Sequence, residues 1–95
     1  MTSKVASIGE DSTENLTAYR MSKVALNMGM QEITKKAEGV HVLLLAPGWV
    51  KTDMGGKHAK ISVQESVSTM RQVIEKAREL KSGGFYDRFG QPIPW

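Results

Sequence analysis

A tyrosine and a lysine stand four residues apart, at Tyr19 and Lys23, where a long helical pattern begins. Positions four apart lie on one face of a helix, one turn from each other. A free phenol has a pKa of about 10, and a cation beside it favours the phenolate. The pair could therefore make Tyr19 a general acid or base. The alternative interpretation is a partly buried tyrosine beside a surface lysine, a pair that is common on helices.

The helix that would carry this pair is predicted from about residue 16 to about residue 37. Its apolar residues recur at helical spacing over a broad face, which indicates more than one buried side. The polar residues 9–15 predict a loop before the helix, and several of them could act as its N-cap. Gly39 is a natural C-terminal stop, and Gly29 is interpreted as a close packing contact.

A nearly continuous apolar run follows at residues 40–46, which favours a strand buried on both faces, as in a parallel sheet. Pro47 and Gly48 end this strand. Residues 49–61 have no regular period and predict a mobile loop. That loop would lie at the carboxyl end of a strand, which is where open α/β sheets bind ligands.

A second helix is predicted to start at Ser62, because Ser62 and Glu65 form a capping box, and to end near Leu80. Its apolar stripe comprises Val63, Val67, Met70, Val73, Ile74, Ala77 and Leu80. Phe85 and Tyr86 form a short strand candidate, followed by a turn at 87–91 and an extended tail.

The order helix, strand, loop, helix, short strand predicts the α/β class, with a parallel sheet and right-handed crossovers. Two strands would leave both faces of such a sheet and at least one edge uncovered. The sequence therefore predicts part of a larger Rossmann-like, doubly wound sheet.

Composition narrows the function classes. The chain has 95 residues, enough for one domain over 1–95, and no cysteine, which fits a reducing compartment. The net charge of +3 is scattered, so we expect no nucleic-acid site. No apolar run reaches transmembrane length, and the first residues do not form a signal peptide. These observations predict a soluble, cytoplasmic protein that does not bind membranes.

Three segments carry a resemblance to a known family. Residues 19–23 (YRMSK) resemble the Y-x-x-x-K signature of the short-chain dehydrogenases/reductases. Residues 47–56 (PGWVKTDMGG) resemble the Pro-Gly…Thr segment that follows the sixth strand there, and residues 3–8 resemble the serine-bearing segment after the fifth. The amino-acid sequences of these motifs and of residues 93–95 (IPW) are similar to those of the C-factor and sniffer-like carbonyl reductase branch.

The resemblance implies that Ser3, Tyr19 and Lys23 are catalytic. Tyr19 would pass a proton to or from the substrate oxygen, and Ser3 would hydrogen-bond and polarise that oxygen. Lys23 would bond the nicotinamide ribose and make the phenol easier to deprotonate. Tyr19 and Lys23 would thus also be cofactor-binding residues. The substrate is expected to be a small carbonyl compound or alcohol.

The resemblance also implies a nicotinamide cofactor, NAD or NADP, with NADP slightly favoured. Pro47 and Gly48 would shape the cofactor wall. The backbone at Val50 and the hydroxyl of Thr52 would hold the nicotinamide carboxamide or a nearby phosphate. Hydride transfer itself belongs to the cofactor. The resemblance implies no metal.

Two serines precede the tyrosine. In this branch the loop between serine and tyrosine is longer than in many relatives, which selects Ser3. Ser7 then matches a second, structural serine. Asn27 is expected to cap or pack rather than to catalyse.

The family's first four strands and its glycine-rich phosphate turn have no counterpart in these 95 residues. We therefore expect the catalytic, C-terminal half of the domain, with an open strand edge and a long helix half uncovered on its sheet side. Such a chain is predicted to be poorly soluble or to assemble with a partner, and by itself to bind nicotinamide nucleotide weakly.

Two functions remain open. The first is an NAD(P)-dependent oxidoreductase that uses a Ser-Tyr-Lys mechanism, with this chain as its catalytic half. The second is a non-catalytic fragment that acts by association, pairing as a homodimer through the helix at 16–37.

Overall fold

The computed structural model describes residues 1–10 and 15–95. The elements, in chain order, are the 3-10 turn η1 (Lys4–Ala6), the helix α1 (Thr17–Lys36), the strand β1 (Leu43–Ala46), the helix α2 (Val63–Glu75), the 3-10 turn η2 (Ala77–Glu79) and the strand β2 (Gly84–Asp87). The two strands are parallel, with Leu43 opposite Gly84 and Ala46 opposite Asp87. The predicted α/β class and parallel pairing are therefore confirmed.

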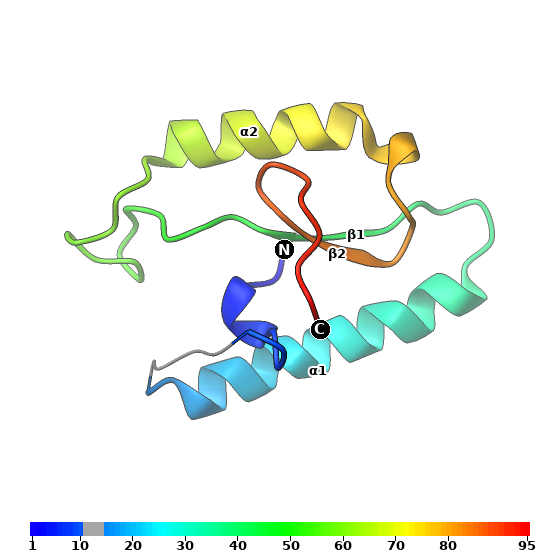
Figure 1. The fold of residues 1–95 in the computed structure, drawn as a ribbon, viewed down its shortest axis with the longest axis horizontal. Coiled ribbons are helices and arrows are strands. Elements are labelled where there is room, and N and C mark those ends of the chain that lie inside the picture. Colours follow the sequence, from blue (N-terminus) through cyan, green and yellow to red (C-terminus); the bar gives the residue numbers. More distant parts are fainter. Residues whose placement is uncertain (11–14) are drawn as a thin grey trace.

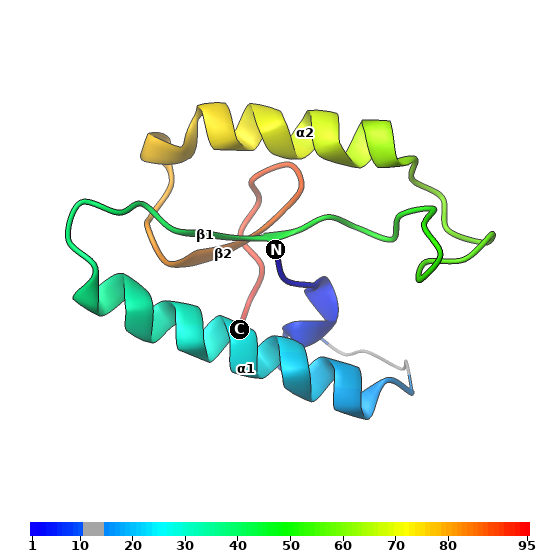
Figure 2. The ribbon, with the colours of Figure 1, turned by 180° about the vertical axis from the view of Figure 1, so that it is seen from behind.

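The sheet lies between the two long helices (Figures 1 and 2). Because successive side chains of a strand point to opposite faces, β1 contributes to two separate cores. Leu44 and Ala46 join Phe85 of β2 in a cluster against which Val24 and Met30 of α1 pack. Leu45 joins Tyr86, Met70 and Val73 in a second cluster on the α2 side.

Both faces of the two-stranded sheet are thus covered, contrary to the prediction that they would be bare. Leu44, Leu45 and Ala46 expose only 3%, 6% and 2% of their surface. The α1 side is less complete, as predicted, because Asn27 is the one buried residue of that helix.

The edges of the sheet are also partly occupied. On the side of β1 away from β2, the N–H of Thr2 donates to the carbonyl of Leu45 (2.9 Å). On the far side of β2 the predicted extended tail turns back, so that the Ile93 N–H donates to the Phe85 carbonyl (2.9 Å). Trp95 then stacks on Phe85 with ring centroids 5.5 Å apart.

The predicted helix at 16–37 is confirmed within one residue at each end. Its N-cap is Leu16, which makes no side-chain cap bond, and not one of the polar residues 9–15 that were expected to cap it. Of those residues, 11–14 lie outside the part of the chain that the structure describes. Gly39 has a φ of +71°, as expected of a residue just past a helix end. Gly29 has no neighbour within 4 Å of the position a Cβ would take, so its interpretation as a packing contact is wrong.

Two other predicted elements are shorter than expected. The strand begins at Leu43 rather than at position 40, because pairing starts opposite Gly84 and Val40 is exposed. The second helix ends at Glu75 and continues as the 3-10 turn η2 before Leu80. Its apolar stripe is also narrower than predicted, since Val63, Val67 and Ile74 are exposed.

The predicted capping box forms in one direction only. The Ser62 hydroxyl accepts the N–H of Glu65 at 3.1 Å, which satisfies one of the free donors at the start of α2. The Glu65 carboxylate pairs with Arg88 at 3.0 Å and not with the backbone N–H of Ser62, as a full capping box would require. The start of α2 is therefore tied to the residue that follows β2.

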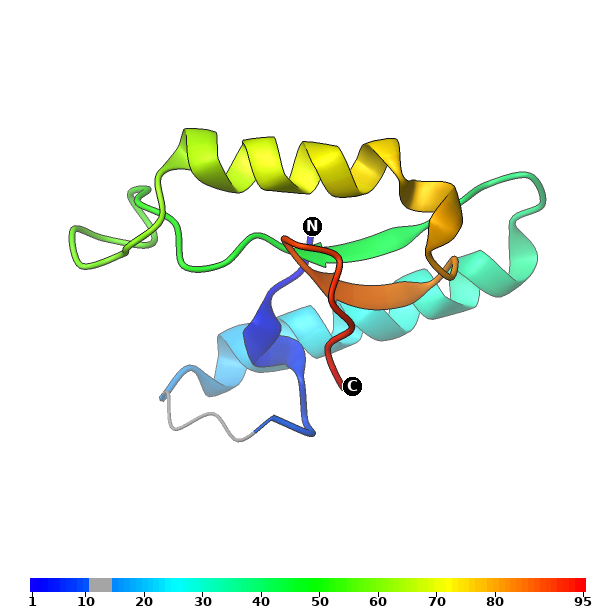
Figure 3. The same ribbon diagram turned by 45° about the horizontal axis from the view of Figure 1, so that its top comes forward.

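The element directions bring several chain segments to one end of the molecule. Because β1 and β2 are parallel, their carboxyl ends share an edge, and the residues that follow β1 extend from it (Figures 1 and 3). The start of α1 and the turn η1 lie at this same end in all three views. Within the described ranges, no helix combines the length and the apolar character that a membrane span requires.

The core position of Leu44 yields the first prediction. Replacing Leu44 by Ala should lower the free energy of unfolding by about 2–5 kcal/mol, because it leaves a cavity between β1 and α1. Urea denaturation followed by circular dichroism measures the loss. The matched control is Ile74→Ala on the exposed face of α2, which should cost less than about 1 kcal/mol. Equal losses at both positions would contradict the two-sided burial of β1.

Candidate active site

Tyr19 and Lys23 lie together in the first two turns of α1. The Lys23 ammonium nitrogen is 5.7 Å from the centroid of the Tyr19 ring, and both residues are half-buried. An ammonium at this distance interacts favourably with the ring and contributes a positive charge beside the phenol. The spacing thus places the two side chains next to each other, as the sequence predicted.

Ser3 lies in a segment that is bound to α1 on both of its flanks. Before Ser3, the Thr2 hydroxyl donates to the Asn27 side-chain oxygen at 2.6 Å in a buried contact. After it, the Arg20 guanidinium donates through Nε to the Val5 carbonyl at 2.9 Å. Ser3 itself is half-buried with an extended backbone, at φ −145° and ψ 148°. These two bonds hold the serine-bearing segment against the helix that carries Tyr19 and Lys23.

Sequence reasoning missed both of these contacts. Arg20 occupies a variable position of the Y-x-x-x-K pattern, and its second bond runs from Nη2 to the Ser7 carbonyl at 3.4 Å. Thr2 and Asn27 are 25 residues apart, so no local pattern connects them. A polar residue on the predicted sheet side of a helix is the one signal that could have identified Asn27. The expectation that Asn27 packs is confirmed, since it is 3% exposed.

Ser7 has a structural role, which agrees with the choice of Ser3 over it. Its side chain is 1% exposed, and its hydroxyl donates to the Pro94 carbonyl and accepts the N–H of Glu10 at 3.0 Å. A hydroxyl engaged in both directions fixes the C-terminal tail against η1.

Pro47 and Gly48 make a tight turn at the carboxyl end of β1. The Pro47 carbonyl accepts the hydroxyl of Ser66, the buried serine in the first turn of α2, at 2.7 Å. Gly48 has a φ of +84°, and a Cβ added there would lie 2.6 Å from the Ile61 side chain. Both the backbone angle and the space therefore require glycine at this position.

The loop that follows has more order than its sequence indicates. Val50 forms a parallel bridge with Ile61, in which the Lys51 N–H donates to the Ile61 carbonyl (2.8 Å) and the Ile61 N–H to the Trp49 carbonyl (3.3 Å). In a parallel ladder these bonds involve the neighbours of the bridged residue, so the N–H of Val50 points away from Ile61. This N–H faces the opposite side of the loop.

Thr52 uses its hydroxyl within the loop. The hydroxyl accepts the N–H of Gly55 at 3.0 Å and reaches the Val50 carbonyl at 3.4 Å. The Trp49 indole N–H donates to the Gly55 carbonyl at 2.8 Å, which closes the same turn. The side chain of Thr52 thus shapes the turn in this structure, and it remains exposed to solvent.

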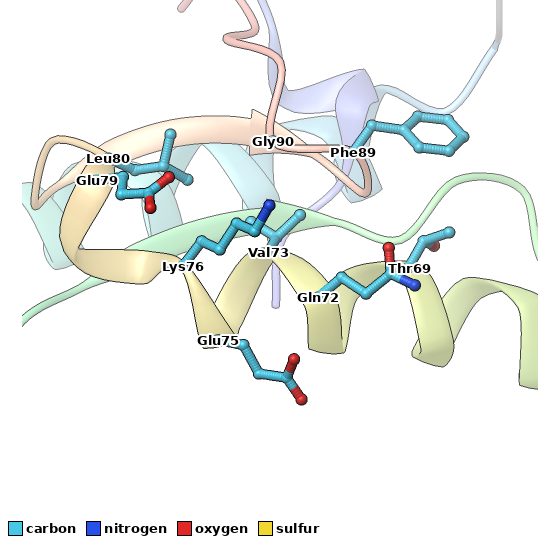
Figure 4. A pocket seen from close by; sticks show the side chains of 9 residues that line it. All are labelled: Thr69, Gln72, Val73, Glu75, Lys76, Glu79, Leu80, Phe89 and Gly90. Atoms are coloured by element: carbon cyan, nitrogen blue, oxygen red, sulfur yellow. The ribbon is translucent and has the colours of Figure 1, made fainter.

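A groove lies elsewhere on the molecule, away from these residues. It has a volume of about 420 Å³ and runs between the second half of α2 and the turn after β2 (Figure 4). Its lining residues are Thr69, Gln72, Val73, Glu75, Lys76, Glu79, Leu80, Phe89 and Gly90. None of the predicted site residues is among them. In the part of the chain that the structure describes, no cluster of three or more His, Cys, Asp and Glu side chains could hold a metal ion.

Comparison with known proteins gives a consistent result, although no protein-family model matches the chain. The C-signal of Myxococcus xanthus is 40% identical over the whole chain, which covers 58% of that protein. The carbonyl reductase Sniffer of D. melanogaster superimposes with a TM-score of 0.89 at 36% identity. An NADPH-bound carbonyl reductase from chicken fatty liver gives a TM-score of 0.86 at 33% identity. The chain spans 39% and 40% of these two structures.

The architecture and these similarities first define the class, a part of a Rossmann-like α/β domain of the kind found in carbonyl reductases. The family follows from the same matches. The chain is homologous to part of the short-chain dehydrogenases/reductases, the family that its motifs indicated. It spans about half, or less, of the length of the relatives it matches.

The Pro47–Gly48 turn leads to the second prediction. Gly48→Ala should lower the free energy of unfolding by at least about 1–2 kcal/mol, because alanine disfavours a positive φ and its Cβ would meet Ile61. Gly29→Ala is the matched control. It lies in α1 with open space around it and should raise stability by about 0.5–1 kcal/mol. Urea denaturation measures the midpoint of unfolding for both variants. A shift of both midpoints in the same direction would contradict the turn geometry.

Proposed function

We propose that the chain supplies the catalytic residues of an NAD(P)-dependent oxidoreductase that reduces a carbonyl group or oxidises an alcohol. The observation that carries the proposal is the double attachment of the Ser3 segment to α1, beside the adjacent Tyr19 and Lys23 side chains. A serine, a phenol and an ammonium then lie in neighbouring segments at the ligand-binding end of the sheet. The similarity to carbonyl reductases supports the same reaction.

In the direction of reduction, the Tyr19 hydroxyl donates its proton to the carbonyl oxygen of the substrate as the carbon accepts a hydride. The Lys23 ammonium beside the ring stabilises the phenolate that remains. The Ser3 hydroxyl donates a hydrogen bond to the same substrate oxygen and keeps the carbonyl oriented. In alcohol oxidation the same groups act in reverse, with the Tyr19 phenolate accepting the proton.

The residues after β1 fit the nicotinamide end of a dinucleotide. A nicotinamide nucleotide supplies or accepts the hydride when it is bound. Gly48 has no side chain, so the backbone at this position can approach a flat ring closely. The N–H of Val50 points away from its bridge with Ile61, and in this proposal it would donate to the carboxamide. Lys23 would bond the ribose hydroxyls, and Pro47 and Thr52 would border the same wall.

NADP is the cofactor we favour over NAD. Two of the similar structures are carbonyl reductases described with NADPH or NADP, from chicken fatty liver and from Pseudomonas aeruginosa PAO1. The first has a sequence identity of 33% with the present chain and the second 35%.

The third prediction concerns Tyr19. We define the completed protein as this chain joined, in the relative's own order, to the part of the M. xanthus C-signal outside the matched region. In it, Tyr19→Phe should lower kcat for a carbonyl substrate by about 10²–10⁴-fold, because the proton donor is lost. The dissociation constant for NADPH should change less than about twofold, since the ring and Lys23 remain.

Tyr86→Phe is the matched control, because Tyr86 is the other tyrosine and its hydroxyl donates to the Lys81 carbonyl on the α2 side. It should leave kcat within about twofold. Unchanged turnover in Tyr19→Phe would overturn the assignment of Tyr19. Absence of NADPH binding by the completed protein would overturn the proposed function itself.

A second candidate function is association through α1. Met21, Ala25 and Met28 recur at helical spacing on the face of α1 away from the sheet, and all three are exposed. The two methionines expose 67% and 63% of their surface. An apolar face of this kind could pair with the same face of a second copy, giving a homodimer.

The fourth prediction separates this candidate from the first. If α1 mediates pairing, sedimentation velocity should show a discrete dimer that Met21→Glu converts to a monomer, because a charge is costly to bury in an apolar contact. Ile74→Glu on the exposed face of α2 is the control and should leave the dimer intact. A polydisperse or unfolded chain, or a dimer unaffected by Met21→Glu, would contradict pairing through α1.

A further inference from the structure

Arg88 is held at the point where β2 ends. Its side chain is 13% exposed, far less than that of a typical surface arginine. Nη2 donates to the Glu65 carboxylate at 3.0 Å, and Nη1 donates to the Thr69 hydroxyl at 3.2 Å. Its guanidinium carbon also lies 4.1 Å from the centroid of the Phe89 ring. The planar guanidinium thus uses two nitrogens and one face at once, which a lysine cannot do.

The partners of Arg88 adjoin the turn proposed to form the cofactor wall. Glu65 is followed directly by Ser66, whose hydroxyl holds the Pro47 carbonyl at 2.7 Å. The aliphatic stem of Arg88 also approaches the same turn, since a Cβ on Gly48 would lie 3.6 Å from the Arg88 Cδ. Arg88 therefore connects the residues after β2, the first turns of α2 and the turn after β1.

We propose that Arg88 is a positioning residue, which fixes the Pro47–Gly48 turn by pinning the start of α2 through Glu65 and Thr69. The proposal deepens the proposed function and rests on it where it concerns the cofactor. Without the guanidinium, the first turns of α2 lose their attachment to the end of β2 and keep only the Ser66–Pro47 bond and the packing of Met70 and Val73. Ser66 then no longer holds the Pro47 carbonyl in one position. The Pro47–Gly48 turn, which would contact the nicotinamide ring, then adopts a wider range of positions.

The contrasting interpretation is an ordinary surface ion pair, because the Glu65 carboxylate is 53% exposed. Exposed pairs contribute little, and their loss changes nothing nearby. Two features favour positioning over this interpretation. The arginine side of the pair is nearly buried, and the second bond to Thr69 places the guanidinium against two successive turns of α2.

The fifth prediction tests the positioning directly on the 95-residue chain. Amide hydrogen exchange measured by NMR should speed up about fivefold or more at Lys51 and Ile61 in Arg88→Gln, because their bonds lie just beyond the turn. The Ile93 amide, bonded to the Phe85 carbonyl, should change less than about twofold. Acceleration of all three amides alike, or of none, would overturn the proposal.

Arg71→Gln is the matched control. It removes the same charge from an exposed ion pair on α2, between Arg71 and Glu75 at 3.3 Å, and it should leave all three amides unchanged. Arg88→Lys should rescue part of the protection, because an ammonium can keep the bond to Glu65 but not the bond to Thr69. If Arg88→Gln does not fold, Glu65→Gln takes its place, with the same amides expected to accelerate.

The second experiment tests the effect of Arg88 on cofactor binding and uses the completed protein. Arg88→Gln should raise KM for NADPH about tenfold while kcat at saturating NADPH stays within about twofold, because the chemical groups on α1 are untouched. Arg71→Gln should alter neither value. A fall in kcat with unchanged KM for NADPH would overturn the role at the cofactor wall. If the parent protein binds no NADPH, the proposed function fails, and the exchange result still decides the role of Arg88 at the turn.

Discussion

The rest of the structure depends on burying the apolar side chains on both faces of β1. Leu44 and Leu45 are adjacent and point to opposite sides, so one strand requires a helix above and a helix below. Parallel pairing with β2 then forces α2 to cross over the sheet. With β1 and β2 pointing the same way, their carboxyl ends, the turn η1 and the start of α1 meet at one end of the molecule. The candidate site is a consequence of that packing requirement.

Local patterns predicted the elements better than they predicted the limits of those elements. The types of α1, β1 and α2 follow from the apolar periodicity, yet β1 starts at Leu43 because its partner strand starts at Gly84. Val63, Val67 and Ile74 fit the helical stripe and are nevertheless exposed, because a sheet of two strands is too narrow to cover them. The proximity of Tyr19 and Lys23 was predictable from their spacing alone. Contacts between distant residues were not, since Thr2 and Asn27 show no shared pattern.

Two arginines have parallel structural roles on the two helices. Arg20 binds backbone carbonyls of the η1 segment from α1, and Arg88 binds side chains of α2 from the end of β2. Both lie close to predicted site residues, and the guanidiniums of both have protein partners. The positive charge near the candidate site therefore serves to hold chain segments in place. Of the cations singled out from the sequence, Lys23 is the one that lies beside the Tyr19 ring.

The bond between the Ser7 hydroxyl and the Pro94 carbonyl joins residues 87 positions apart. The neighbouring Ile8 N–H reaches the Trp95 carbonyl, so the serine-bearing segment and the tail secure each other. Contacts of such long sequence separation carry a large loop-closure entropy and form slowly, whereas helices form within microseconds. The Tyr19–Lys23 pair, which is local to α1, can thus assemble early in folding. The serine segment can join α1 soon afterwards, because its bonds to that helix span only 25 and 15 residues. Its bonds to the tail form only when nearly the whole chain has been drawn together, so the candidate site has a part that folding reaches early and a closure that it reaches late.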